Sequence, residues 1–414
     1  MIEAPDRRPI RLVVSDDLQR SRLTVFFRLL LALPHFVWIL LWSAAAFTVA
    51  FVAWLAVLFE RRVPRTLHDF LAAYLRYATH VSAYLYLAAG PYPGFTGRPG
   101  YPVDVEIDPP REQGRWGAGF RLVLALPALL LMAALVGGGG GGNSGGSAGI
   151  AAVAAFLAWF ACLAQGRMPR GLRDLVTYAL GYGAQATGYL LMLTSRYPSA
   201  DPSLVQPPAE LPEHPVRLVL TDTLERSRLT VLFRLLLSFP HLVWLTLWTV
   251  VVLLVSFFVW LVALVLGRVP RFLHRFLAAW VRYTAHVSAF LYVVGGPFPG
   301  FLGAAGSYPV DVEIDPPARQ HRLKTLFRFL LALPALLLAG AFGTVLLVVA
   351  VLGWFYALFT GRMPPGLRDL GAVSVRYSAQ ASAYLFLLTD RYPYSAPALA
   401  APPHDEQLEL VPTP

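Results

Sequence analysis

The same pattern occurs four times along this chain. Each copy opens an apolar segment with a Phe-Arg pair, carries a proline a few residues later, and continues through a basic, proline-containing turn into a segment rich in aromatic residues. The four pairs are Phe27-Arg28, Phe120-Arg121, Phe233-Arg234 and Phe327-Arg328. Because self-similarity of this kind marks one structural unit that has been copied, the sequence predicts four similar repeats.

Two longer stretches recur almost unchanged and show how the repeats are grouped. The sequence HVSAYLY at 80–86 returns as HVSAFLY at 286–292, and YPVDVEIDPP stands at both 101–110 and 308–317. A unit of two repeats has therefore been duplicated. We expect membrane repeats at 1–100, 101–198, 215–306 and 307–394, a proline-rich and acidic linker at 199–214, and a disordered tail at 395–414.

The composition predicts an integral membrane protein. Apolar residues make up 57% of the chain and charged residues 14%, whereas a soluble domain has about 25% charged residues. The polar segment 1–19 has no apolar core or small-residue cleavage site and is not expected to be a cleaved leader. We therefore expect a multi-pass protein of the cytoplasmic membrane with both termini in the cytoplasm. The only cysteine, Cys162, excludes disulfides and cysteine-based metal sites.

Each apolar segment is too long for one perpendicular membrane span. In the first repeat it runs from Leu23 to Phe59, which as one helix would measure about 55 Å at 1.5 Å per residue, against a hydrocarbon core of about 30 Å. The second repeat has an extra glycine-rich stretch that begins at 137–142. Lengthening a turn costs little, whereas an insertion inside a lipid-exposed span would leave backbone groups unpaired. We therefore expect a hairpin of two short helices, at 23–42 and 46–59 in the first repeat.

The hairpin hypothesis also separates charge across the membrane. The expected turns lie near Ser43, Gly140, Thr249 and Gly343 and carry no charge, so nearly all basic residues fall on the opposite side, as the positive-inside rule requires. The alternative keeps one tilted helix from Pro34 to Glu60 and makes the aromatic helix a span as well. Both hypotheses predict eight spans.

A short strand is expected at the start of each repeat. Val103, Val105 and Ile107 alternate with acidic residues, whereas the equivalent runs of the first and third repeats carry Arg11 and Arg217. Opposite charges on neighbouring strands favour pairing the two kinds, as one small sheet outside the membrane. The predicted fold class is thus an all-α integral membrane protein with four repeats of helical hairpin plus amphipathic helix and short external strands.

The turn after each apolar segment is rich in arginine. The candidate residues there are Arg62, Arg65, Arg167, Arg170, Arg268, Arg271 and Arg362. Two interpretations stay open, namely simple interfacial anchoring of a helix end or a binding site for lipid phosphates. Although the net charge is +10, the arginines lie beside apolar spans, so the expected partners are the bilayer and its anionic headgroups and not nucleic acid.

The helix after the turn carries a polar stripe. Its candidate residues are Arg76 and His80, Arg282 and His286, and Arg376. At 100° per residue these side chains share one face, opposite the aromatic and aliphatic residues. The stripe is the water-exposed face of an interfacial helix, a polar pathway through the membrane, or a set of structural hydrogen bonds.

Three motifs together resemble a known family. They are FR-x-L-L-A-x-P, then GR-x-P-R-G-L, and an aromatic helix that ends before Asp390-Arg391-Tyr392-Pro393. The chain resembles tandem copies of the bacterial domain-of-unknown-function 4389 family (DUF4389) of small membrane proteins. It departs from the pattern at Glu60-Arg61, at Pro365 and in the glycine insertion. The resemblance implies an integral membrane protein and no particular activity.

No residues form an enzyme or cofactor signature. Walker, nucleophile-elbow, zinc-protease and dinucleotide motifs do not occur, and His35 and His241 have no partner at metal-ligand spacing. We therefore expect no catalytic residues, no cofactor and no metal. The predicted function is a non-enzymatic scaffold that organises lipid or a partner. A transporter or channel for an anion or lipid is the alternative, and a membrane enzyme the second alternative.

Overall fold

The computed structural model describes residues 8–137, 148–204 and 212–399. The chain forms two compact units. The first comprises the described residues up to 204 together with Pro334–Leu352 and Tyr394–Pro397, and the second comprises residues from 212 to Leu333 and Gly353–Pro393. The two units have the same internal plan, and each is described by itself below.

Each unit contains one two-stranded antiparallel sheet. Strand β1 (Ile10–Val14) pairs with β2 (Val103–Ile107), and β3 (Val216–Leu220) pairs with β4 (Val310–Ile314). Arg11 lies directly opposite Glu106, and Arg217 directly opposite Glu313. The expected pairing of basic strands with acidic strands is therefore confirmed. The single small sheet is corrected to two sheets, since each acidic strand pairs within its own unit.

The apolar segment of the first repeat is one long helix, not a hairpin. After two short helices, α1 (Arg22–Phe26) and α2 (Arg28–Leu31), helix α3 (Leu33–Glu60) continues without interruption through the expected turn. The stretch at 43–46 is Ser-Ala-Ala-Ala, and alanine is the best helix former. Ser43 Oγ donates a hydrogen bond to the Ile39 carbonyl at 2.5 Å, so the polar residue is satisfied inside the helix.

The apolar segments of the third and fourth repeats also contain one long helix and no hairpin. Helix α10 (Arg234–Leu266) follows the short α9 (Arg228–Leu232), and α13 (Arg328–Thr360) follows the short α12 (Arg322–Leu326). Thr249, which was expected in a turn, lies within α10 and donates its hydroxyl to the Leu245 carbonyl at 2.6 Å. Gly343 lies within α13. The helical hairpins are therefore wrong for these repeats.

Among the repeats that the structure describes, only the second is divided at the place where the hairpin turn was expected. After the short α5 (Arg115–Gly119), helix α6 (Arg121–Val136) ends and α7 (Ile150–Gln165) begins. The turn expected near Gly140 lies outside the described residues. A Cβ atom built on Gly149 would come within 2.2 Å of the Gly137 nitrogen. Gly137 and Gly149, on either side of the undescribed residues, are therefore adjacent, and the other repeats have continuous helix at this place.

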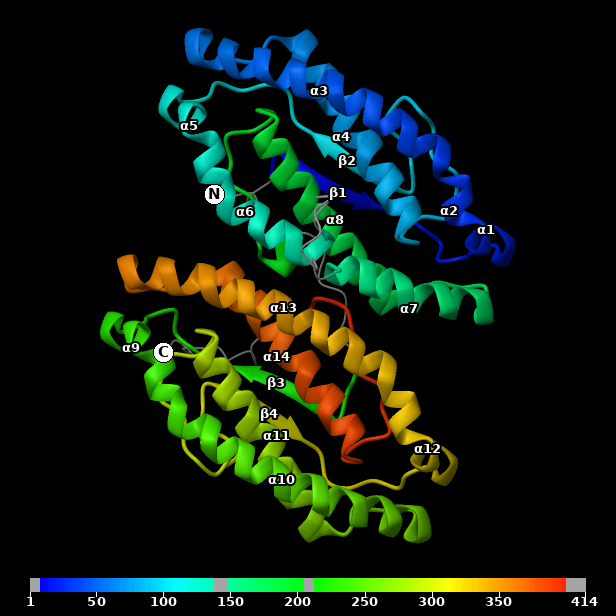
Figure 1. Cartoon of the computed structure of the whole chain (residues 1–414), viewed down its shortest axis with the longest axis vertical. Helices are drawn as coiled ribbons and strands as arrows, with labels where there is room; N and C mark the ends of the chain where they lie inside the picture. Colours follow the sequence, from blue (N-terminus) through cyan, green and yellow to red (C-terminus); the bar gives the residue numbers. More distant parts are fainter. Residues whose placement is uncertain (1–7, 138–147, 205–211, 400–414) are drawn as a thin grey trace, which may run out of the picture. The chain divides into compact units, whose positions relative to one another are not determined.

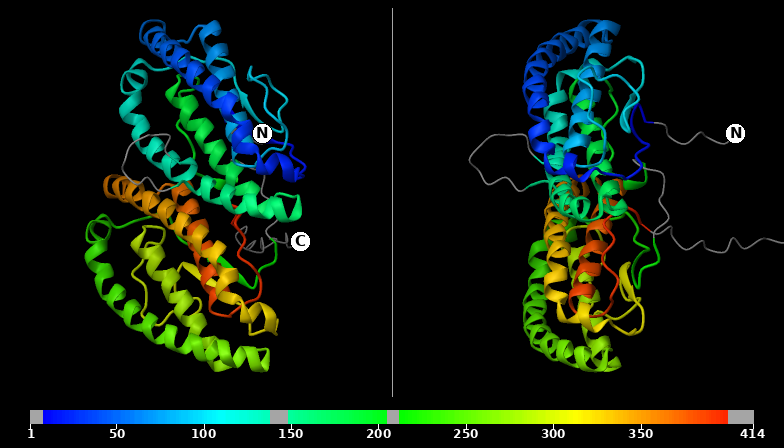
Figure 2. Two further views of the ribbon diagram at one scale, coloured as in Figure 1. Left: turned by 45° about the vertical axis from the view of Figure 1, so that its right-hand side comes forward. Right: turned by 90° about the vertical axis from the view of Figure 1, so that its right-hand side faces the viewer.

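The third helix of each repeat forms the middle layer of a unit. These helices are α4 (Arg65–Leu85), α8 (Arg170–Leu190), α11 (Arg271–Leu291) and α14 (Pro365–Leu385). In the first unit α4 packs on α8, with α3, α6 and α7 on one side and the strands β1 and β2 on the other (Figures 1 and 2). In the second unit α11 packs on α14, with α10 on α11 and the strands β3 and β4 on their other side.

The core of the first unit lies where these layers meet. Buried apolar side chains of β1 and β2 contact those of α4, among them Ile10, Val105, Leu71 and Leu75.

Backbone hydrogen bonds join the two repeats of the first unit in both directions. The Arg20 N–H donates to the Gly166 carbonyl at 2.9 Å, and later in the unit the N–H of residue 113 donates to the carbonyl of residue 61 at 2.8 Å. The start of the apolar segment in each repeat therefore contacts the turn that ends the apolar segment of the other repeat in the unit.

Candidate membrane interface

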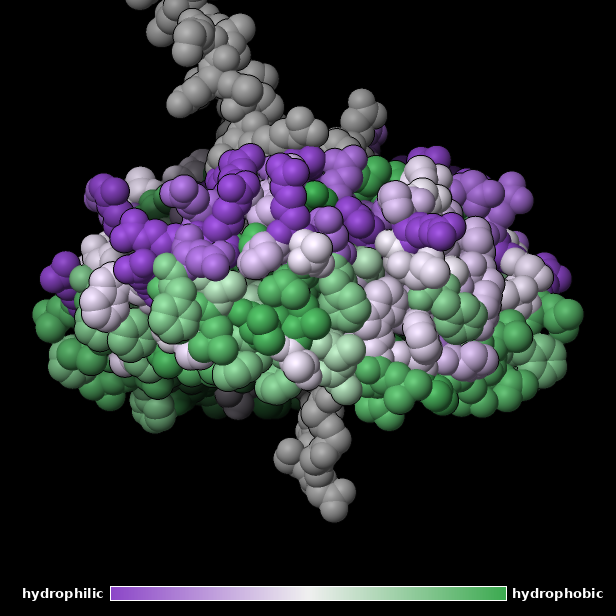
Figure 3. All heavy atoms as spheres, turned by 90° about the horizontal axis from the view of Figure 1, so that it is seen from above, coloured by the Kyte–Doolittle hydropathy of each residue, from purple (hydrophilic) through white to green (hydrophobic). Residues whose placement is uncertain are grey.

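The outer side of the apolar helices is exposed and almost entirely hydrophobic. In the first unit Leu29 is 72% exposed, Leu40 71% and Phe47 78%. Figure 3 shows hydrophobic residues gathered along one side of the view and hydrophilic residues along the other. Soluble monomers rarely expose a continuous apolar surface of this kind. Three helical stretches, 28–60, 234–266 and 328–360, are long and apolar enough to cross a membrane.

The seven candidate turn arginines are all exposed and lie at the ends of the apolar helices. They are Arg62, Arg65, Arg167, Arg170, Arg268, Arg271 and Arg362. Three of the turns contain a glycine in the left-handed conformation, for example Gly267 with φ +67°. In the first repeat Arg61 takes this conformation with φ 58°. The departure at Glu60-Arg61 therefore keeps the backbone of the turn but places a side chain where glycine is favoured.

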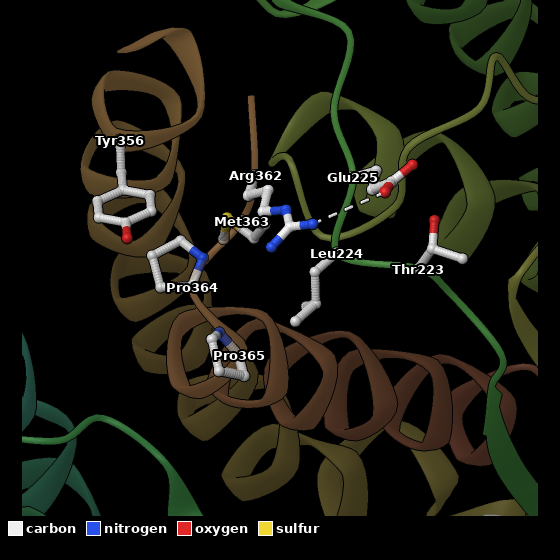
Figure 4. A pocket seen from close by; sticks show the side chains of 8 residues that line it. All are labelled: Thr223, Leu224, Glu225, Tyr356, Arg362, Met363, Pro364 and Pro365. Carbon is white, nitrogen blue, oxygen red and sulfur yellow. Dashed lines mark ion pairs between the residues drawn. The ribbon is translucent and has the colours of Figure 1, made fainter. Parts of the chain in front are cut away.

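Most of these arginines have no acidic partner among the described residues. Within the described part of the chain, no salt bridge joins the turn arginines of the first three repeats to a carboxylate. The fourth repeat differs, because Arg362 lies 4.0 Å from Glu225 and Pro365 takes the place of an arginine (Figure 4). A pocket of about 550 Å³ opens beside this pair, with Tyr356 on its wall. The turns of repeats one to three are thus the ones that present unpaired positive charge.

The polar stripe of the third helix contacts the sheet. His80 Nε2 lies 2.8 Å from Asp104 Oδ1 of β2, and Arg76 Nε donates to the Val105 carbonyl at 3.0 Å. In the second unit His286 Nε2 lies 2.7 Å from Asp311 Oδ1, and Arg282 Nε donates to the carbonyl of residue 312 at 2.9 Å. These contacts correspond to the interpretation of the stripe as structural hydrogen bonding, although the partners are strands and not helices.

The carboxylate beside His80 is held in its ionised form. Burial alone would raise the pKa of Asp104, but hydrogen bonds from His80 and from the N–H groups of Gly100 and Val105 lower that pKa below its ordinary value. The corresponding bonds to Asp311 have the same effect on its pKa. Arg376 of the fourth repeat is 4% exposed and therefore buried as well. The stripe is occupied by internal contacts of each unit.

The Phe-Arg pairs have a role that sequence analysis did not assign. The four arginines are Arg28, Arg121, Arg234 and Arg328, and each is 2–3% exposed. Each guanidinium lies over an aromatic ring near the end of the third helix of its own repeat, at 4.2–4.6 Å from the ring centroid. The first of them donates to the carbonyls of Tyr84 at 2.5 Å, Ala89 at 3.2 Å and Gly90 at 3.3 Å.

The aromatic ring and the backbone carbonyls around each of these arginines form what we call the carbonyl cage. It forms because the third helix ends in the same way in every repeat. A non-glycine residue just beyond the helix has a positive φ, for example Leu87 with φ 63° and Met192 with φ 61°. The turn leaves the last carbonyls without intrahelical partners, and the C-terminal end of a helix attracts positive charge. A single arginine in an otherwise apolar segment, present in all four repeats, was the only sequence signal for this site.

A second side chain satisfies carbonyls at the same helix end. Arg20 Nη2 donates to the Leu87 and Ala88 carbonyls, both at 2.9 Å, and to Asp16 at 2.7 Å. In the second repeat Gln113 Nε2 donates to the Met192 carbonyl at 2.6 Å. Arginine and glutamine thus perform the same task in the odd and even repeats. No sequence pattern indicated this shared role, because arginine and glutamine are dissimilar residue types.

The two histidines that follow the prolines lie in aromatic surroundings. His35 is fully buried, its Nδ1 lies 2.7 Å from Tyr77 Oη, and its ring stacks on Phe95 with centroids 4.5 Å apart. His241 has the same environment, with Tyr283 Oη at 2.8 Å. Among the described residues no group of three or more His, Cys, Asp or Glu side chains could hold a metal ion. The surroundings of both histidines are those of a packed core.

These features define a class of tandem-repeat, predominantly helical proteins whose longest helices have the length and composition of membrane spans. A family model described as "Domain of unknown function (DUF4389)" matches residues 22–96, 146–200, 228–299 and 322–396. These four matches cover more than half of the chain, which therefore belongs to this family. The resemblance and the tandem repeats are confirmed. Searches of curated proteins and of solved structures gave no match.

Proposed function

We propose that this protein is a non-enzymatic membrane protein that organises anionic lipids around its basic turns. The observation that carries the proposal is the combination of an exposed apolar helix face with exposed arginines at the ends of the same helices. Acyl chains remove the apolar side chains from water. Each arginine near an anionic membrane surface gains about 1 kcal/mol from it.

One further observation favours a scaffold over a transporter. The side chains that a polar pathway would need, Arg76, His80, Arg282 and His286, make hydrogen bonds to the sheets and are buried or half-buried. A transported ion would have to break these contacts in order to use them. The location in the cytoplasmic membrane, the multi-pass arrangement and the cytoplasmic termini remain predictions.

Lipid selectivity tests the proposal directly. The protein is reconstituted in phosphatidylcholine vesicles that contain a small fraction of spin-labelled phosphatidylglycerol, and the motionally restricted fraction of that lipid is measured. We expect the double variant Arg167→Gln/Arg170→Gln to reduce this fraction. The matched control, Arg98→Gln/Arg111→Gln, removes the same charge from exposed residues of the same unit that lie outside the turns, and we expect it to have little effect.

A flux assay separates the scaffold from the transporter. Proteoliposomes are tested for chloride release and for scrambling of a fluorescent phospholipid, with protein-free vesicles as the reference. We expect rates equal to the reference. Flux that disappears in a folded Arg282→Ala variant would replace the scaffold with a transporter, whereas equal lipid restriction in both double variants would remove the role of the turns.

A further inference from the structure

In the second unit the long apolar helix α10 lies beside α11, a helix with polar side chains on its far side. Helix α10 leads through a short turn into α11, and at the other end Arg234 of α10 lies over Phe290 near the end of α11. The two helices are therefore antiparallel neighbours. On its side toward β4, α11 carries Arg282 in its middle and His286 in its second half. An α11 of 21 residues measures about 31 Å, so this helix, with the sheet bonded to its middle, is as long as a bilayer core is thick.

The sheet of the same unit presents exposed charges beside the middle of these helices. Arg217 pairs with Asp315 at 2.9 Å, and their side chains are 49% and 43% exposed. Glu313 is 56% exposed. If α10 stood along the bilayer normal, these charges would lie at mid-depth, where ionised side chains are very unfavourable.

Exposed apolar residues follow α10 lengthwise. Leu235, Leu242 and Leu253 of α10 are 77%, 39% and 55% exposed. Successive members of this set differ by 7 and 11 residues, so at 100° per residue all three lie within about 20° of one line along the helix. Leu33 and Phe51 mark an equivalent line on α3, with 52% and 55% exposure. The exposed apolar surface of α10 therefore continues along the helix past the level of the charged sheet, so the border between apolar and polar surface runs along the helix and not across it.

A protein that crosses a bilayer has an apolar band that ends at both ends of its helices. Each of these units instead has one apolar side and one polar side. We propose that each unit is embedded in a single leaflet, with its long apolar helices parallel to the membrane plane, its sheet in water, and the turn arginines at headgroup depth. This proposal rests on the membrane location proposed above and replaces the multi-pass arrangement. The occupant of the apolar face is the acyl chains of one leaflet.

Depth measurements along one helix test this orientation. In a full-length Cys162→Ala background, single cysteines replace Leu235, Leu242 or Leu253 and carry a nitroxide label. The depth of each label is measured by power saturation in vesicles of phosphatidylcholine and phosphatidylglycerol. We expect the three depths to agree within about 5 Å. An upright α10 would separate the first and last labels by about 27 Å, at 1.5 Å per residue.

The outcomes separate this inference from the proposed function. A depth difference greater than about 15 Å between residues 235 and 253 overturns the in-plane orientation while leaving lipid selectivity untouched. Labels that all contact water would instead overturn the membrane location. The pair Leu33→Cys and Phe51→Cys on α3 repeats the test in the first unit, where we expect equal depths again, and Glu313→Cys serves as the water-exposed reference.

A second experiment asks from which side the ends of α10 are reached. Ser227 and Arg268 flank the apolar segment of the third repeat, and both are exposed. A membrane-impermeant maleimide is added to sealed vesicles that carry Ser227→Cys or Arg268→Cys. We expect both positions to be labelled from the same side. Labelling of the two positions from opposite sides would show that α10 crosses the bilayer and would overturn the proposal.

Discussion

Replacing Arg28 by methionine tests the assigned role of the Phe-Arg pair. The variant Arg28→Met keeps an unbranched side chain of similar length but removes all five N–H donors. Three carbonyls, of Tyr84, Ala89 and Gly90, lose their donor, and the contact between the guanidinium and the Tyr84 ring at 4.3 Å is lost. Hydrogen bonds from charged groups contribute about 1.5–3 kcal/mol each. A desolvated cation–π contact contributes about 2 kcal/mol.

The burial of the charge opposes these terms. Arg28 is 3% exposed, and the cost of removing a guanidinium from water is several kcal/mol, which the methionine variant no longer bears. The net expected loss is about 3 kcal/mol in the free energy of unfolding. For a unit of roughly 200 residues this corresponds to a decrease of about 6–12 °C in Tm.

The measurement is thermal unfolding in a mild detergent, followed by tryptophan fluorescence, with the variant and the unaltered protein compared at one protein concentration. Arg22→Met is the matched control, because Arg22 is exposed and donates one hydrogen bond, to the Ala164 carbonyl at 2.9 Å. We expect its Tm to change by no more than about 3 °C, as is usual for a surface side chain. A Tm for Arg28→Met that matches this control would refute the carbonyl cage as a stabilising element.

Three further predictions follow from local geometry. Arg61→Gly relieves a left-handed backbone at φ 58° and should stabilise the protein by about 1 kcal/mol, whereas Gly267→Ala at φ +67° should destabilise it by a similar amount. Chemical denaturation of both variants measures the two changes in the free energy of unfolding, and equal stability of both variants would contradict the prediction. Deleting residues 138–149 shortens the separation of Pro127 and Arg167 from 40 to 28 residues, which is the separation of Pro34 and Arg62 in the first repeat. The deletion should leave the circular dichroism spectrum and Tm nearly unchanged, so a loss of helix content would show that the insertion is required for folding. Because the pKa of Asp104 is lowered in the folded protein, the stability that Asp104 contributes is complete above its unfolded pKa of 3.8 and is lost as the pH falls through the lower folded value. Asp104→Asn should therefore weaken the dependence of Tm on acid pH. An unaltered dependence would argue against the ionised pair with His80.

The sequence by itself determined the repeat plan, the apolar character of the long segments and the pairing of basic strands with acidic strands. Repetition of the Phe-Arg pairs requires no contact information, and the alternation of Arg11 in one repeat with Glu106 in the next indicates which strands carry opposite charge. The length of the apolar segment was evident, but its predicted division into a hairpin was wrong for the first, third and fourth repeats. The insertion in the second repeat suggested a turn in every repeat, while the local sequence around Ser43 favours helix.

Only the tertiary structure decided what the polar residues contact. His80 and Arg76 were recognised as one stripe, yet their partners, Asp104 and the Val105 carbonyl, lie more than twenty residues away on a strand. Arg28 is held by carbonyls that follow the third helix, and these become available only because Leu87 turns the chain out of the helix. The periodicity of a helix shows which side chains share a face. What covers that face depends on how distant segments pack. Every residue has a backbone carbonyl, so the sequence does not indicate which carbonyls accept hydrogen bonds from these side chains.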